Sequence, residues 1–144
     1  MYEIQYLVSE TILPVQDIVE YARGLKNFFQ LIDVSALISE EQLIFATERL
    51  ERIRNLARIR SKPLLLLCLV SGEHQIKNAI TKAGIRPDTR SAVCLYESEN
   101  TMIDFLRMFD CFKVSKDPLL PSTSPERDAE LFGKMVSSQL RLVS

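Results

Sequence analysis

Residues 64–85 read LLLLCLVSGEHQIKNAITKAGI, and this stretch governs how the sequence on either side is interpreted. Its first seven residues are apolar without alternation, which is typical of a strand covered on both faces in a sheet between helices. Ser71 is predicted to cap a helix that runs from Gly72 to Ala83, and Gly84 is well placed to end that helix.

The flanking sequence alternates further strands and helices. Apolar residues at alternating or helical spacing predict strands at 2–6, 30–34, 91–97 and 111–115, and helices at 14–29, 40–55, 100–110 and about 125–142. We therefore expect an α/β fold, a single-domain layered sandwich over residues 1–144 with a mixed sheet of about four to five strands flanked by helices.

The composition is that of an ordinary globular chain, with 47% hydrophobic and 26% charged residues. The longest apolar stretch is far too short to span a membrane, and the opening MYEIQYLV does not resemble a secretion signal. The expected compartment is the cytoplasm. Cys68, Cys94 and Cys111 form no CxxC pair, so neither a disulfide framework nor a zinc site is expected, and Cys68 and Cys94 are expected to be buried.

The sequence lacks the common signatures of catalysis. It has one histidine and four glycines, and it contains no GxGxxG, no phosphate loop ending in Gly-Lys-Ser/Thr and no GxSxG. The carboxylates are scattered rather than paired. We therefore expect a protein that is not an enzyme and that holds neither a metal ion nor a cofactor.

Positive charge is concentrated in one segment of a nearly neutral chain. Residues 48–62 hold six bases and two acids, whereas residues 1–47 hold seven acids and two bases. Arginine and lysine contact phosphates without base specificity, so this run is a candidate anion-binding patch. The alternative interpretation is a solvated helix face whose bases pair with Glu48 and Glu51.

The turn at 70–76 is the second candidate feature. A helix N-terminus at Gly72 exposes unpaired N–H groups that favour phosphate or carboxylate, and His74 and Gln75 lie in its first turn. The alternative is a helix that is merely capped by Ser71. A seven-residue strand spans about 23 Å, so the turn and the basic run are not required to meet.

The same residues resemble a known family. The segments QLIDVSALISEEQLIFATERL, then RS, then LLLLCLVSGEHQIKNAITKAGI and SAVCLY are similar to the small kinase-binding subunit of the KEOPS complex, the TPRKB (PRPK-binding protein) family. The resemblance covers roughly residues 28–97, and its most specific part is the turn Ser71–Ile76 with the helix that follows.

The resemblance implies a non-catalytic subunit of the complex that makes threonylcarbamoyl-adenosine in tRNA. It implies two partners, the small atypical protein kinase of the complex and the single-stranded 3′ CCA end of tRNA, with no membrane and no metal. Carried over by position, the implied tRNA-binding residues are Arg58, Arg60, Ser61, Lys62, Ser71, Gly72, Glu73, His74, Gln75 and Ile76. A rival of another class is a stand-alone small-ligand or anion-binding domain, or an enzyme without a recognised motif, that uses the helix N-terminus at Gly72.

Three positions depart from the family pattern. His74 replaces a usual arginine, Gln42 stands where histidine is frequent, and Leu65 stands where an acid is frequent. Neutral histidine lacks a permanent charge, which weakens the implied phosphate contact. For the kinase, Leu131 and Leu142 lie off the main apolar stripe of the C-terminal helix, and they are candidate contacts if exposed.

Overall fold

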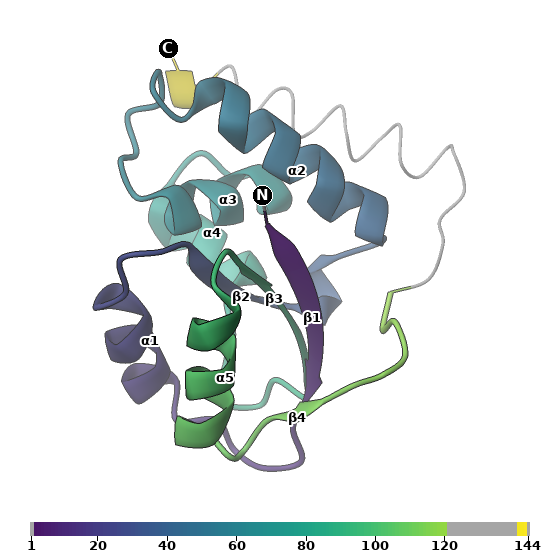
Figure 1. Cartoon of the computed structure of the whole chain (residues 1–144). Helices are drawn as coiled ribbons and strands as arrows, with labels where there is room; N and C mark the ends of the chain where they lie inside the picture. The colour runs from purple at the N-terminus through teal and green to yellow at the C-terminus, as the bar shows by residue number, and fades with distance from the viewer. Residues whose placement is uncertain (1, 121–140, 144) are drawn as a thin grey trace. The chain divides into compact units, whose positions relative to one another are not determined.

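The computed structural model of the chain describes residues 2–120 and 141–143 (Figure 1). Contacts within the chain form two compact units, one made of residues 1–34 and 85–119 and the other of residues 35–84 and 120–144. The first unit contains a sheet with helices and the second is helical where it is described. The predicted α/β class is confirmed.

The sheet of the first unit has the order β2-β3-β1-β4. The strands are β1 (Glu3–Val8), β2 (Phe29–Asp33), β3 (Ser91–Tyr96) and the short β4 (Lys113–Val114). Every pair is antiparallel: β3 pairs with β1 and β2, and β4 pairs with the end of β1. The expected mixed sheet is therefore wrong, whereas the expected strand number holds for the described residues.

Two helices connect strands that are not neighbours. Helix α1 (Val15–Arg23) joins β1 to β2, and helix α5 (Glu99–Met108) joins β3 to β4. Strand β3 lies between β1 and β2, and strand β1 lies between β3 and β4, so each connection forms a split βαβ motif. The order β-α-β-β-α-β with this strand arrangement is the ferredoxin-like topology, and the helical unit is inserted between β2 and β3.

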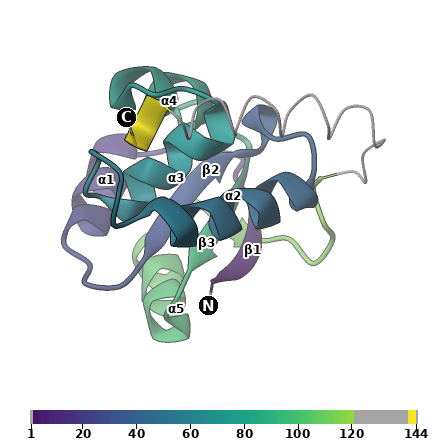
Figure 2. The same ribbon diagram turned by 90° about the horizontal axis from the view of Figure 1, so that it is seen from above.

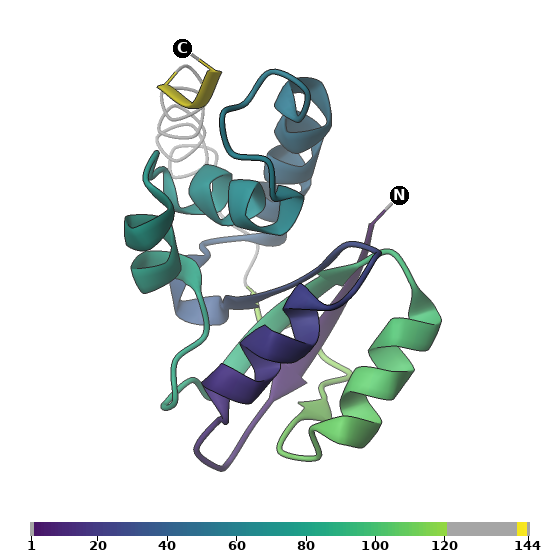
Figure 3. The same ribbon diagram turned by 90° about the vertical axis from the view of Figure 1, so that its left-hand side faces the viewer.

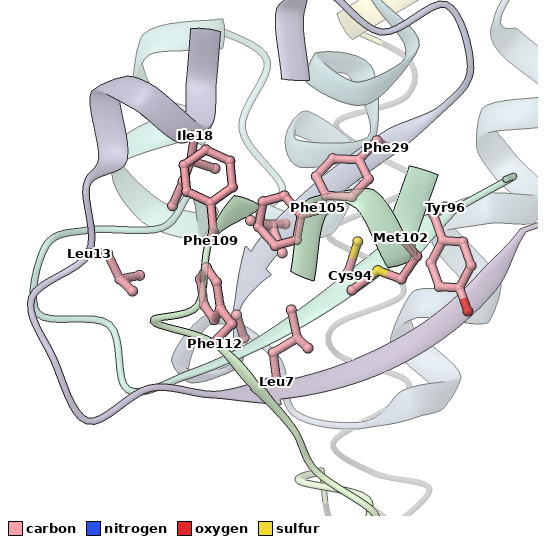
Figure 4. Close-up of a cluster of buried hydrophobic side chains, with 12 residues drawn as sticks. Leu7, Leu13, Ile18, Phe29, Cys94, Tyr96, Met102, Phe105, Phe109 and Phe112 are labelled. Atoms are coloured by element: carbon pink, nitrogen blue, oxygen red, sulfur yellow. The ribbon is translucent and has the colours of Figure 1, made fainter. Parts of the chain in front are cut away.

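The core of the first unit lies between the sheet and its two helices (Figure 3). Alternate residues of the strands point toward Ile18 of α1 and Phe105 of α5, and Phe105 contacts several other rings (Figure 4). Strand β3 is buried along almost its whole length because it is central in the sheet. This aromatic cluster fixes α1 and α5 on the same face.

Helix α2 (Glu40–Ile53) opens the second unit. The Ser39 side chain accepts a hydrogen bond from the Gln42 backbone N–H at 3.3 Å, so Ser39 is the N-cap of the helix. Its apolar stripe includes Leu43, Ala46 and Leu50, all fully buried. The helix ends at Ile53, close to the expected position near Asn55.

The segment predicted as a strand at 64–70 is a helix. Helix α3 (Lys62–Ser71) packs against α2 and against α4 (Ile76–Ala83) (Figure 2). Residues 65–71 are all buried, so the helix is apolar on every side. A short apolar run without alternation does not distinguish a covered strand from a buried helix, and tertiary packing decided in favour of the helix.

The next helix also begins later than predicted. Gly72 terminates α3 instead of starting a helix, and α4 begins only at Ile76 with Gln75 as its N-cap. Ser71 is the last residue of α3, so it is not the predicted cap. The predicted helix at about 125–142 and its Leu131 fall outside the described residues, except that 141–143 are helical.

We predict that the three thiols react in order of exposure. Cys68 and Cys94 are fully buried, as expected, while Cys111 is partly exposed. Burial raises the pKa of Cys68 to about 11, which also disfavours its reactive thiolate. Native protein treated with iodoacetamide at pH 8 should be alkylated first at Cys111, with the other two modified only after unfolding, as read by peptide mass. Rapid native labelling of Cys94 would contradict this packing.

Candidate nucleic-acid interface

The connector between α2 and α3 carries the first part of the candidate site. It runs from the end of α2 to Ser61, and Arg58 and Arg60 are exposed on it. The Ser61 side chain accepts a hydrogen bond from the Leu64 N–H at 3.4 Å, and Pro63 lies in the first turn of α3. Ser61 is thus the N-cap of α3. The prediction of a strand at 64–70 did not include such a cap.

The turn between α3 and α4 carries the second part. Gly72 has a φ of 75°, the left-handed conformation that reverses the chain after a helix. The Ser71 hydroxyl donates to the Cys68 carbonyl and accepts from the Glu73 N–H. These bonds lock the turn and place His74 and Gln75 at the start of α4.

Both parts line one open pocket of about 790 Å³ in the second unit. We call it the basic pocket. Its described lining comprises Arg58, Ile59, Arg60, Ser61, Leu64, His74, Gln75, Ile76 and Leu142. The basic run and the turn therefore meet, because α3 is a helix whose ten residues extend only about 15 Å and α4 folds back against it.

The electrostatics of the basic pocket favour an anion. Ser61 and Gln75 are the N-caps of α3 and α4, so the positive ends of two helices open onto the same space. Arg58 and Arg60 add formal positive charge, and the described lining includes neither aspartate nor glutamate. Ile76 adds an apolar wall beside these polar groups.

The pocket contains six of the ten residues implied for tRNA binding: Arg58, Arg60, Ser61, His74, Gln75 and Ile76. The other four do not line it. Ser71 is buried and bonded within its turn, Gly72 shapes that turn, and Glu73 forms an ion pair with Lys82 at 3.9 Å. Lys62 is exposed in the first turn of α3, outside the lining.

The bases on α2 and at its C-cap fit the alternative interpretation, in which the basic run is a solvated helix face. Arg54 forms an ion pair with Glu51 at 3.2 Å, and the Arg49 guanidinium lies 4.8 Å from the centre of the Phe45 ring. In contrast, Arg60 makes neither an ion pair nor a side-chain hydrogen bond with the described residues. Only the connector part of the basic run therefore faces the pocket.

Two of the departures from the family pattern lie in the core. The Gln42 amide accepts from the Ile38 N–H at 2.8 Å and donates to the Val70 carbonyl at 3.1 Å, which links the start of α2 to the end of α3. Gln42 and Leu65 are both buried, at 0% and 1% exposure. Their effect is on packing, whereas His74 is the departure that lies in the pocket.

Sequence reasoning missed three apolar residues of the pocket, Ile59, Leu64 and Leu142. Leu142 does not meet the condition set for a kinase contact, because only 2% of it is accessible. Its position in the pocket comes from contacts between residues far apart in the chain, for which the sequence carried no local signal. Leu64 is the first residue of the apolar run for which a strand is predicted, so it was not a candidate for the site.

No family model matches this chain, and no curated protein is significantly similar to it.

Within residues 2–120 and 141–143, no group of three or more histidine, cysteine, aspartate or glutamate side chains is placed to hold a metal ion. In the same part of the chain, no helix combines the length and apolar character needed to cross a membrane.

We predict that the left-handed turn residue is required for stability. Gly72→Ala should lower the free energy of unfolding by about 1–2 kcal/mol, the cost of a side chain in this conformation. Gly24→Ala is the matched control, because Gly24 also follows a helix but has a φ of −81° and room for a methyl group. Urea unfolding of both variants measures the difference, and equal stabilities would contradict the assigned turn.

Proposed function

We propose that this chain is a non-catalytic subunit of the KEOPS complex that works in the cytoplasm, binds the unpaired 3′ CCA end of tRNA and binds the small kinase of that complex. The observation that carries the proposal is the basic pocket, which gathers two helix N-termini, Arg58, Arg60 and His74 around one space. The chain would recruit tRNA for threonylcarbamoyl-adenosine formation without performing chemistry itself.

The pocket chemistry favours an unpaired strand over a duplex. Single-stranded RNA is recognised by proteins that combine cations for the phosphates with flat or apolar surfaces for splayed bases. Arg60 and the two helix N-termini suit the phosphates, and Leu64 and Ile76 suit the face of a base. A duplex keeps its bases stacked inside and offers none to such a pocket.

The resemblance over residues 28–97 supports the second partner, the kinase. It also supports the tRNA end as the ligand, since the turn Ser71–Ile76 that carries the resemblance leads into the pocket at His74. The rival anion-binding domain loses its stated anchor, because Gly72 ends α3 rather than starting a helix. The helix N-terminus at Ile76 opens onto the same pocket, so a binding experiment has to separate the two proposals.

We predict that tRNA binding depends on the CCA tail. Removing the tail should weaken binding at least tenfold in a filter or fluorescence assay, because the pocket loses its ligand. Equal affinity for intact and trimmed tRNA would contradict the proposal. Competition by inorganic phosphate or a mononucleotide as effective as competition by a CCA oligonucleotide would favour the rival.

We predict that Arg60→Ala weakens tail binding and reduces the slope of log affinity against log salt by about 0.7, the value for one phosphate contact on a single strand. Arg52→Ala is the matched control, since Arg52 is an exposed arginine of α2 outside the pocket lining. The control should leave the slope nearly unchanged. If both variants shift the slope alike, Arg60 holds no phosphate.

For the kinase, we predict that the chain co-purifies with the small KEOPS kinase of its own organism, and that the pair survives ribonuclease treatment. Arg60→Ala should leave this association intact, because Arg60 is assigned to a phosphate of the RNA. A pair that dissociates when RNA is digested would show an RNA bridge in place of direct contact. Size-exclusion chromatography with mass determination gives the result.

A further inference from the structure

Arg58 is held by the C-terminal turn of the chain. Its guanidinium donates a hydrogen bond to the Arg141 carbonyl at 2.9 Å, and its backbone N–H donates to the Leu142 carbonyl at 3.2 Å. Arg58 and Arg141 are 83 residues apart in the sequence. In Figure 1 the yellow C-terminal turn lies beside the connector that follows α2. Two donors of one residue thus fix the connector to this turn.

The fixed turn contributes a wall of the basic pocket. Leu142 lines the pocket and is nearly inaccessible to solvent, so its side chain packs within the unit. The backbone N–H at position 58 binds the Leu142 carbonyl whatever the side chain, so the Arg58 guanidinium acts on Leu142 through the carbonyl of the preceding residue, Arg141. Arg60 differs from Arg58 because its guanidinium has no partner of this kind among the described residues.

We propose that Arg58 is a positioning residue, which holds Leu142 as a wall of the basic pocket so that the C-terminal turn sets the affinity for an unpaired RNA end. The proposal rests on the proposed function, and it assigns different roles to Arg58 and Arg60, the two arginines of the described pocket lining. Arg60 contacts phosphate, while Arg58 directs its guanidinium to a carbonyl and acts on the RNA through Leu142.

The two roles differ in measurable ways. Loss of a phosphate contact lowers the salt slope, whereas loss of a wall lowers affinity with little change in that slope beyond the effect of one removed charge. Residues that act through one another also show non-additive effects in a double-mutant cycle. A direct phosphate contact by Arg58 would instead add to the effect of a Leu142 substitution.

The experiment measures binding of a fluorescent CCA-ended oligonucleotide to the full chain at several salt concentrations. The variants are Arg58→Gln, Leu142→Ala and the double variant, with Arg60→Gln and Arg52→Gln as charge-matched controls. Arg58→Gln should bind about fivefold more weakly, the loss of one net hydrogen bond. Its salt slope should match that of Arg52→Gln, and the double variant should bind no more weakly than the weaker single variant.

Leu142 is buried, so its alanine variant is first checked by thermal melting. Leu142→Val replaces it in the cycle if the alanine variant is not folded. A second readout is the methyl signal of Leu142 in the NMR spectrum, which should shift on addition of the oligonucleotide and shift less in Arg58→Gln.

Three outcomes decide between the possibilities. Non-additive effects with an Arg52-like slope support the positioning role. Additive effects, together with a slope lowered by about 0.7 as for Arg60→Gln, overturn it and make Arg58 a phosphate contact, while the proposed function stands. Failure of the unaltered chain to prefer a CCA-ended strand overturns the proposed function itself, and the positioning role with it.

Discussion

The burial of residues 65–71 on every side of α3 governs the packing of the helical unit. Residues 65–71 have no exposed side, so α2 and α4 must both pack against them. The chain can return along α3 only through a tight reversal, and Gly72 supplies it in a conformation that other residues adopt at a cost. Once α4 is folded back, the connector before α3 and the turn before α4 line the same pocket.

This arrangement explains how a chain with a net charge of only −1 can present a site for an anion. The positive ends of two helices are properties of backbone geometry and leave the total charge unchanged. Arg58 and Arg60 add to them locally, while acidic partners such as Glu51 occupy α2 and Glu73 pairs with Lys82 outside the lining. Local placement therefore matters more than composition.

The sheet unit has a different character. Its ferredoxin-like topology is found with many unrelated functions, so it carries no argument about activity by itself. Its aromatic cluster around Phe105 and its buried central strand β3 account for its stability. The helical unit is inserted between β2 and β3, and the pocket residues described here all belong to that insertion and to the C-terminal turn.

From the sequence alone we predicted the α/β class, the strands near residues 3–8, 29–33 and 91–96, helix α2, and the burial of Cys68 and Cys94. The bases of the basic run and the turn at 70–76 include five of the residues that line the pocket, and the family resemblance added Ser61. The elements and the buried cysteines follow from local periodicity, and the basic run follows from charge clustering. The helical conformation of residues 64–70 follows from packing in the folded chain, because a short run that is apolar on every side has no period that distinguishes a helix from a strand. Only the tertiary structure decided that Leu142 is buried beside Arg58, because contacts between distant parts of a chain leave no local pattern.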